Sequence, residues 1–364
     1  MALTLADILR DHVPSYTQLH RKELTSAHYR ALRAILDCRT PAMGGRVYTC
    51  KCGKPHYAYH SCNHRSCPSC GSHDQAVWSA KQEAKLLSGV TYYMLTFTLP
   101  AELRPALRAF QREGYSALLR CSAQALKDVI ATKYQGATIG FTSVLHTWGR
   151  QVQYHPHVHL IVPALALKDD DLVKPTKPDS FLVHYRPLAD RFRTLMRSAL
   201  QEVDGLTLSQ EACIALSPAT TWNVQVKPVG AGKTALRYLA RYVTKTALTN
   251  QRILGYTTGG KVSVKWNCST TNRTNVMELH PHELIRRVLQ HVLPKGLTRV
   301  RHYGYLSPAA IKKRLLIRAL LGEIGEPLPV LPELPTPCCA ECGGELTLVR
   351  ILKAPRPPND SWKI

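Results

Sequence analysis

The segment YHPHVHLIVP, residues 154–163, places His155, His157 and His159 at alternate positions. In an extended strand, alternate side chains point to the same face, so these imidazoles would lie together. Val158 and the apolar residues after His159 are typical of a buried strand. Imidazoles gathered on one face indicate a divalent metal site, but a hydrogen-bonded structural cluster fits this segment equally well.

His146, in SVLHTWG, offers a further ligand from a second segment. The strands expected at 138–149 and 158–163 should pair antiparallel, which would bring His146 beside His157 and His159. Three imidazoles leave positions on an ion open for a substrate oxygen, as in a catalytic site. His155 lies nearest the loop, and we expect it to flank the site or to contact a phosphate.

Twelve cysteines are present, and six of them lie between Cys38 and Cys70. Such clustering without a secretory leader favours metal ligation over a disulfide framework. A closed four-ligand zinc site would fold a small domain and would not catalyse. Zinc is expected on Cys50, Cys52, Cys67 and Cys70, with Cys38, Cys62 and His64 as alternative ligands. The Cys50-Lys51-Cys52 spacing is one residue tighter than the usual knuckle, which leaves the exact set open.

A second cysteine-rich segment, CCAECGGELTLVRIL, follows the proline-rich stretch 326–337. Its Cys-x-x-Cys-Gly-Gly turn before an apolar strand is similar to half of a zinc ribbon. Cys339 and Cys342 are therefore expected to form part of a second zinc site, which cysteines such as Cys38 and Cys62 could complete.

The segment KTALRYLARYVTKTAL carries Tyr238 and Tyr242 four residues apart, and therefore on one face of the expected helix 233–247. Tyrosines at this spacing are commonly core aromatics. The same helix, however, is strongly basic, and a basic helix is an unusual source of a buried face unless phosphate lies against it. Its cationic residues are Lys233, Arg237, Arg241 and Lys245.

The elements that must position these residues alternate between strands and helices. Strands are expected at 92–100, 138–149, 158–163 and 221–228, and helices at 105–133 and 187–202. The order strand, helix, strand, strand, helix, strand is that of a ferredoxin-like split βαβ unit. The predicted fold class is therefore α+β, with an antiparallel sheet that carries its helices on one side, an N-terminal zinc-binding module and a helical C-terminal region.

The chain is divided by these patterns into five consecutive parts. The expected parts are an N-terminal helical segment (1–37), a zinc-binding and DNA-binding module (38–88), the α+β domain (89–268), a basic helical DNA-binding region (269–325), and a proline-rich tether with a cysteine knuckle (326–364).

The charge of the chain is strongly positive, with 48 Lys and Arg against 25 Asp and Glu, a net charge of +23. Such an excess favours a nucleic-acid partner, because each neutralised phosphate releases counterions. No apolar run approaches the roughly 18 residues of a membrane helix, so a cytoplasmic, DNA-associated protein without a membrane partner is expected. The basic residues expected to contact DNA are Arg65, Lys233, Arg237, Arg241, Lys245, Arg286, Arg287, Lys295, Arg299 and Arg301.

Five short stretches occur in order between residues 61 and 304: SCNHRSCPSCG, TFTLPAEL, LHTWG…HPHVH, YLARYV and LQHVLPKGLTRVRHYG. Together they resemble the two-tyrosine HUH transposases of rolling-circle insertion sequences, the insertion-sequence ninety-one type. These are related to Helitron transposases, conjugative relaxases and rolling-circle replication initiators. His157-Val158-His159 would be the HUH motif, which alone is weakly specific, and the tyrosines of the basic helix would be the nucleophiles.

The resemblance implies a single-strand DNA endonuclease and strand transferase that acts at hairpin-containing element ends in bacteria. Tyr238 or Tyr242 would form a 5′-phosphotyrosine link and release a 3′-hydroxyl. Because a phenol with a pKa of about 10 is a poor nucleophile at pH 7, Mg²⁺ or Mn²⁺ at His146, His157 and His159 would polarise the phosphate. A plasmid replication initiator or relaxase with the same site, or an inactive zinc-dependent DNA-binding protein, are the alternatives.

Overall fold

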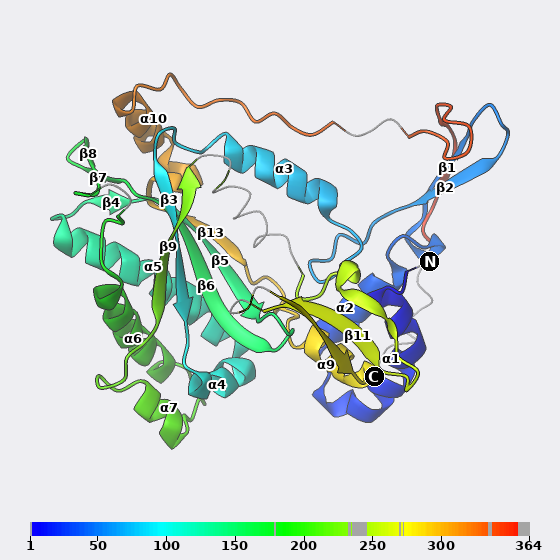
Figure 1. The fold of residues 1–364 in the computed structure, drawn as a ribbon, viewed down its shortest axis with the longest axis horizontal. Helices are drawn as coiled ribbons and strands as arrows, with labels where there is room; N and C mark the ends of the chain where they lie inside the picture. Colours follow the sequence, from blue (N-terminus) through cyan, green and yellow to red (C-terminus); the bar gives the residue numbers. More distant parts are fainter. Residues whose placement is uncertain are drawn as a thin grey trace. The chain divides into compact units, whose positions relative to one another are not determined.

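The computed structural model describes residues 2–177, 180–231, 234, 246–268, 271, 273–333 and 337–355. The chain forms two compact units (Figure 1). The first consists of Met1–Asp74, Lys245–Val292 and Pro332–Ile364, and the second of Gln75–Thr244 and Leu293–Leu331. Each unit is assembled from segments far apart in the sequence. The predicted division into five consecutive parts is therefore not the division of the structure.

The second unit contains a five-stranded sheet in the order β13-β5-β6-β3-β9, and all its neighbouring strands are antiparallel. Helix α5 (Gln111–Lys133) connects β3 to β5, α6 (Tyr185–Gln201) lies between β6 and β9 in the chain, and β6 is inserted between β3 and β5. This is the split βαβ arrangement, and the predicted α+β class is confirmed. The strands are β3 (Thr91–Thr98), β5 (Phe141–Trp148), β6 (Tyr154–Pro163), β9 (Val224–Ala231) and β13 (Val300–Tyr303).

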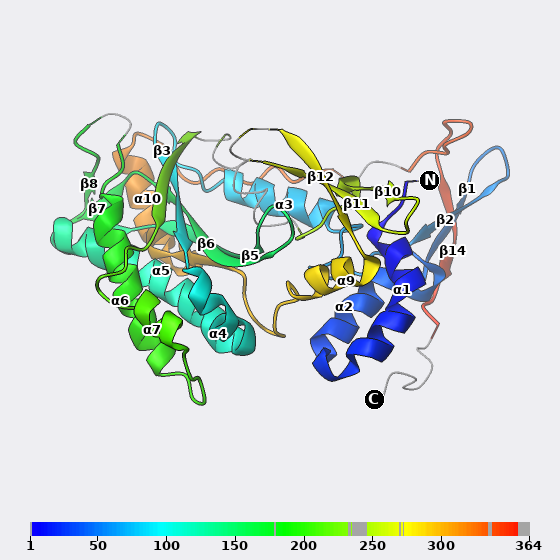
Figure 2. The ribbon, with the colours of Figure 1, turned by 60° about the horizontal axis from the view of Figure 1, so that its bottom comes forward.

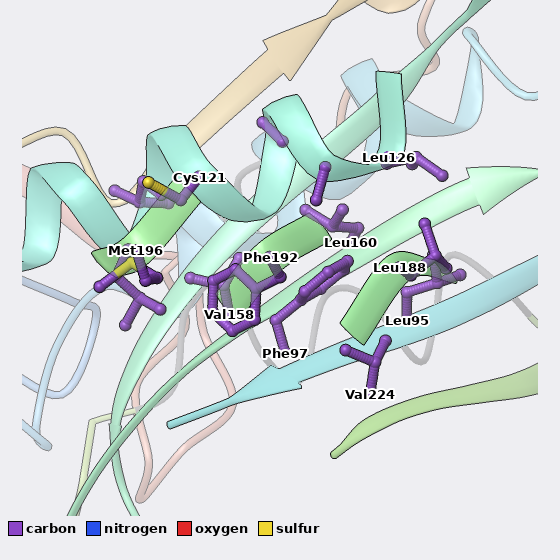
Figure 3. Packing of buried hydrophobic residues seen from close by; sticks show 14 of the residues in the cluster. Leu95, Phe97, Cys121, Leu126, Val158, Leu160, Leu188, Phe192, Met196 and Val224 are labelled. Atoms are coloured by element: carbon purple, nitrogen blue, oxygen red, sulfur yellow. The ribbon is translucent and has the colours of Figure 1, made fainter. Parts of the chain in front are cut away.

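One face of this sheet is covered by helices (Figure 2). Residues at alternate positions of the strands, such as Leu95, Phe97 and Val158, pack against Phe192 and Met196 of α6 (Figure 3). Burial of these side chains accounts for the position of the helical layer, because the hydrophobic effect scales with the apolar area removed from water. The remaining elements of this layer are η3 (Ala101–Leu103), α4 (Arg104–Ala109) and α7 (Gln210–Ala215).

On the opposite face of the sheet, the apolar cluster formed by the described residues lies toward one end. There Tyr92, Met94 and Ile161 pack with Tyr305 and Ile317. Tyr305 belongs to η5 (Gly304–Leu306), and Ile317 belongs to α10 (Ile311–Leu320), which follows η6 (Pro308–Ala310). A small sheet of β4 (Thr138–Ile139), β7 (Ala166–Lys168) and β8 (Asp171–Val173) completes the described part of the unit. The other end of the face carries the histidines.

The first unit contains a helical part. Helices α1 (Leu5–His20) and α9 (Pro281–Leu289) are in contact, as are α1 and α2 (Ser26–Asp37). Each helix buries an apolar stripe at helical spacing, as with Leu5, Ile8 and Leu9 of α1. Thr4 and Thr25 provide the N-caps of α1 and α2. Helix α3 (Ser72–Glu83) begins at the end of this unit's first segment and continues into the second unit.

Two antiparallel sheets complete the first unit. One has the order β10-β11-β12, with β10 (Ile253–Tyr256), β11 (Val262–Asn267) and β12 (Thr274–Leu279). The other has the order β14-β1-β2, with β1 (Gly45–Thr49), β2 (Pro55–Tyr59) and β14 (Thr347–Leu352). Short 3-10 turns lie at Arg21–Glu23, Pro41–Met43 and Asn250–Arg252. Among the described residues, no helix is both long and apolar enough to cross a membrane.

Candidate metal centres

Three histidines converge on one face of the five-stranded sheet. Strands β5 and β6 pair antiparallel, as predicted, with His146 directly opposite His157. His159 lies two residues further along β6 and therefore on the same face. One ring nitrogen from each of the three lies within 4.8 Å of the others. All three side chains are buried, at 4%, 9% and 5% exposure.

The imidazoles of β6 are oriented by hydrogen bonds. Nδ1 of His157 donates to the backbone carbonyl of His155 at 2.7 Å, and Nδ1 of His159 lies 3.0 Å from the Thr96 hydroxyl. The two Nε2 atoms face each other at 3.0 Å. Neighbouring ligands of an octahedral ion with bonds of about 2.1 Å are separated by about 3.0 Å, so this pair fits adjacent positions on one ion. Engaging Nδ1 while presenting Nε2 is the usual support of a metal-ligating histidine.

His146 is held by a stacked aromatic ring. The ring of Trp148 lies 4.7 Å from that of His146, centroid to centroid, with an interplanar angle of 17°. The Arg299 guanidinium lies over the Trp148 ring, 5.9 Å from the ring centroid. His146 is nearly perpendicular to both His157 and His159. Its ring plane is therefore fixed independently of the β6 hydrogen bonds.

Burial keeps His157 and His159 neutral. Burial lowers the pKa of His157 to about 4 and lowers the pKa of His159 well below its usual value. A metal binds only the neutral form of imidazole, so a site that stays neutral below pH 6 avoids competition from protons. His155, which we expected to flank the site, is half-buried, and burial likewise lowers its pKa. Its contribution to orienting His157 comes through its carbonyl oxygen.

Sequence reasoning missed Thr96 and Trp148. Thr96 lies directly opposite His159 in the β3–β6 pairing, and Gln225 of β9 lies directly opposite Thr96 on its other side. Lys227, two residues along β9, points to the same face and is exposed. The alternation of polar Thr96 with buried Leu95 and Phe97 was visible in the sequence, but not the strand that would lie beside it.

The cysteines form two clusters that differ from the prediction. Cys38 and Cys62 lie with Cys67 and Cys70, whereas Cys50 and Cys52 lie with Cys339 and Cys342. The expected set of Cys50, Cys52, Cys67 and Cys70 is wrong, and so is the pairing of the C-terminal cysteines with Cys38 and Cys62. The reason is the pairing of β14 with β1, which brings the C-terminal knuckle to the turn after β1. His64 belongs to neither cluster.

The sulfur separations are suited to zinc. In a tetrahedral site with Zn–S bonds of about 2.3 Å, two sulfurs are about 3.8 Å apart. Cys62 and Cys70 have a Sγ–Sγ distance of 3.7 Å. In the second cluster, the distance is 3.9 Å from Cys52 to Cys339 and 3.7 Å from Cys342 to Cys50. Cys50 and Cys52 lie closer, at 2.8 Å.

One thiol in each cluster is poised as a thiolate. The side chain of Cys67 donates to Cys62 and is the main cause that lowers the pKa of Cys62 to about 5. Backbone N–H groups of Cys342 and Glu341 lower the pKa of Cys339 to about 6. Because thiolate is the form that binds zinc, each cluster has a ready first ligand.

The predicted DNA-contacting residues fall into several groups. Arg286 and Arg287 both pair with Glu283, at 2.6 and 2.7 Å, and Arg286 is the main cause that lowers the pKa of Glu283 to about 2. Arg299 stacks on Trp148. Arg65 and Lys295 are exposed, and Arg301 is half-buried in β13. Tyr238, Tyr242, Lys233, Arg237, Arg241 and Lys245 lie outside the described residues.

Comparisons with known proteins agree on one family. Residues 140–314 match a family described as "Putative transposase", and residues 8–99 match one described as "Transposase zinc-binding domain". The zinc-binding match contains the whole cluster of Cys38, Cys62, Cys67 and Cys70, but it does not reach Cys339 and Cys342. No solved structure matches the chain significantly.

Two relatives cover most of the chain. A protein of Sinorhizobium fredii (strain NBRC 101917 / NGR234) named "Putative transposase y4qJ" is 34% identical over 339 residues, which are 87% of this chain and 84% of the relative. The transposase for insertion sequence element IS801 of Pseudomonas savastanoi pv. phaseolicola is 30% identical over 290 residues, which are 75% of this chain and 68% of the relative. With both transposase domains matched and both relatives covered over more than two thirds of their length, the chain belongs to the IS91-type family of transposases.

Proposed function

We propose that this transposase nicks and rejoins single-stranded DNA at the ends of its element through a 5′-phosphotyrosine intermediate, and so drives rolling-circle transposition. The observation that carries the proposal is the convergence of His146, His157 and His159 on one face of the sheet. A buried cluster of three imidazoles, of which His157 and His159 are neutral and oriented through Nδ1, is a costly arrangement for a purely structural role, because each buried polar group must be satisfied.

The donor set fits a divalent ion. His146, His157 and His159 would hold Mg²⁺ or Mn²⁺, and the imidazole nitrogens favour Mn²⁺ over the harder Mg²⁺. When bound, such an ion supplies Lewis-acid polarisation of the scissile phosphate. Thr96 and the carbonyl of His155 keep the Nε2 atoms of their histidines directed to one point. Trp148 restricts the ring of His146 by stacking.

The proposed nucleophile is Tyr238 or Tyr242. The phenol oxygen loses its proton to solvent or to a nearby base and attacks the phosphorus. The bond from phosphorus to the 3′-oxygen breaks, and that oxygen takes up a proton to leave a 3′-hydroxyl. The phosphodiester energy is kept in the tyrosyl ester, so a 3′-hydroxyl can later reverse the reaction on a new strand. A second tyrosine permits a second transfer before the first is resolved.

Single-stranded DNA is the proposed substrate, and the hairpin-containing element ends are the proposed sites of action. The exposed Lys227 and Gln225 lie on the same sheet face as the histidines and can contact a backbone phosphate. The zinc module, with the exposed Arg65 beside its first cluster, would add a second, independent contact to DNA.

The test is formation of a covalent adduct. The protein is incubated with Mn²⁺ and labelled single-stranded oligonucleotides from both element ends, and the products are separated on a denaturing gel. We expect an adduct with the wild type, a weaker one with Tyr238→Phe or Tyr242→Phe, and none with the double variant or with His157→Ala. The matched control is Tyr185→Phe, which changes an exposed tyrosine of α6 and should leave the adduct unchanged.

Two results would refute the assignment. An adduct that persists in the double phenylalanine variant would show that another residue is the nucleophile. A wild type that binds the oligonucleotides but forms no adduct with any end sequence would instead support an inactive zinc-dependent DNA-binding protein. Adducts formed on plasmid origins in preference to element ends would favour a replication initiator or relaxase.

A further inference from the structure

We propose that Cys50, Cys52, Cys339 and Cys342 bind a second structural zinc ion, which closes a zinc ribbon assembled from the N-terminal and C-terminal parts of one chain. The matched zinc-binding domain ends at residue 99, so it accounts for the cluster of Cys38, Cys62, Cys67 and Cys70 but not for this one. The proposal does not depend on the proposed strand transfer.

The strand pairing creates the site. Strand β14 pairs antiparallel with β1, from Gly45 opposite Leu352 to Thr49 opposite Thr347. The turn between β1 and β2 carries Cys50 and Cys52, and the turn before β14 carries Cys339 and Cys342. Figure 2 shows the three strands side by side. Two knuckles at the same end of a three-stranded sheet are the plan of a zinc ribbon, here with Cys52 and Cys339 separated by 287 positions in the sequence.

The second knuckle is shaped by its own backbone. The sulfur of Cys339 accepts hydrogen bonds from the backbone N–H groups of Cys342 and Glu341. The N–H of Gly343 donates to the Cys339 carbonyl oxygen at 2.9 Å. Gly343 has a φ of 67°, in the left-handed region where a side chain would be strained. These features give the tight turn that places two thiolates on one ion.

Apolar packing cannot hold this sheet together. Within the three strands, Val47 is the one buried apolar side chain, and β2 and β14 have no buried residue. Leu348, Val349 and Ile351 of β14 are exposed. Three short strands without a core are unstable in water, and small domains of this kind depend on a metal.

The polar contacts between the two segments point the same way. Lys54, in the turn after Cys52, pairs with Glu341 between the C-terminal cysteines. Both side chains are more than half exposed, so this ion pair aligns the knuckles but contributes little stability. Fixing two segments so distant in sequence requires a strong link, because the entropy of closing the loop opposes it. Four thiolate ligands on one zinc ion provide such a link.

The first test is the zinc content of the purified full-length chain. We expect two zinc ions per chain by mass spectrometry of the metal. Cys339→Ser combined with Cys342→Ser should leave one zinc, and Cys62→Ser combined with Cys67→Ser should also leave one. The control is Cys213→Ser, which changes an exposed cysteine of α7 in the other unit and should leave two. One zinc in the wild type, or an unchanged content in the Cys339, Cys342 variant, overturns the proposal.

A second readout remains decisive if a variant folds poorly. Amide hydrogen exchange of β1 in the zinc-loaded wild type should be slow, and removal of the C-terminal cysteines should accelerate exchange in Gly45–Thr49 while β3 and β6 stay protected. Unchanged exchange in β1 would contradict a ribbon completed by β14. The molecular mass of the protein in solution tests whether both knuckles of the zinc site come from one chain. A zinc-dependent dimer that the Cys339, Cys342 variant abolishes would show that a second copy supplies these ligands. That result would overturn the single-chain assembly.

Discussion

The hydrogen bond between Thr96 and His159 provides a sharp test of the histidine site. The Thr96→Val change removes the hydroxyl that lies 3.0 Å from Nδ1 of His159 and leaves the volume of the side chain almost unchanged. Thr96 is 9% exposed, and its hydroxyl contacts Nδ1 of His159, whereas Nε2 of that histidine faces His157. The change therefore leaves all three imidazoles in place but releases the orientation of one.

The expected magnitude follows from the role of such supporting hydrogen bonds. Losing one typically weakens metal binding by about 10-fold to 100-fold, which corresponds to about 1.4–2.7 kcal/mol. A buried imidazole nitrogen left without its partner also lowers the free energy of unfolding by about 1–3 kcal/mol. We therefore expect a weaker affinity for Mn²⁺ together with a moderate loss of stability.

The assay is a titration of Mn²⁺ into protein that contains zinc but no other metal. Binding is monitored by calorimetry or by the paramagnetic resonance of the free Mn²⁺ ion. The matched control is Thr142→Val. Thr142 makes the same type of hydrogen bond, 2.9 Å from its hydroxyl to Nδ1 of His302, in the same unit but outside the histidine cluster. The control should lose similar stability and keep its Mn²⁺ affinity. Equal Mn²⁺ affinities for Thr96→Val and wild type would refute a metal site oriented by Thr96. So would equal losses of Mn²⁺ affinity in Thr96→Val and Thr142→Val.

Three further changes test separate parts of the account. Because burial lowers the pKa of His157 to about 4, this histidine takes up a proton between pH 6.5 and 4 in the unfolded chain but not in the folded one. The protein without Mn²⁺ or Mg²⁺ should therefore lose up to about 3 kcal/mol of stability as the pH falls from 6.5 to 4. Urea titrations at both pH values should show a smaller loss for His157→Gln. Glu283→Gln should release Arg286 and Arg287, lower stability by less than about 1 kcal/mol, and strengthen DNA binding with a steeper salt dependence; unchanged binding would argue against contact between this helix and DNA. Lys227→Gln should weaken binding of single-stranded DNA and reduce the slope of log affinity against log salt by about 0.7; an unchanged slope would place Lys227 away from the phosphates.

The core of the fold could be predicted from local patterns. Aromatic and β-branched residues in 92–100 and strand-forming apolar residues in 158–163 identified the strands, and the order of strands and helices identified the split βαβ unit. A short connection between β5 and β6 sufficed to place His146 opposite His157. Each of these inferences depends on residues close together in the chain.

The features that could not be predicted depend on long-range pairing. A Cys-x-x-Cys knuckle does not encode which other knuckle shares its ion, and the pairing of β14 with β1 decides it. Thr96 became a partner of His159 only through the pairing of β3 with β6. The four residues of β13 were too few for a periodic signal and were assigned to a basic helical region, although they form the edge of the main sheet.

Identification of the residue that becomes linked to DNA tests the proposed strand transfer most directly. The adduct formed with an element-end oligonucleotide and Mn²⁺ is digested with protease and nuclease, and the modified peptide is sequenced by mass spectrometry. The account predicts a 5′-phosphonucleotide on Tyr238 or Tyr242, and loss of that peptide when His159 is changed to alanine. A modified peptide from any other part of the chain, or one that forms equally well without His159, would contradict it.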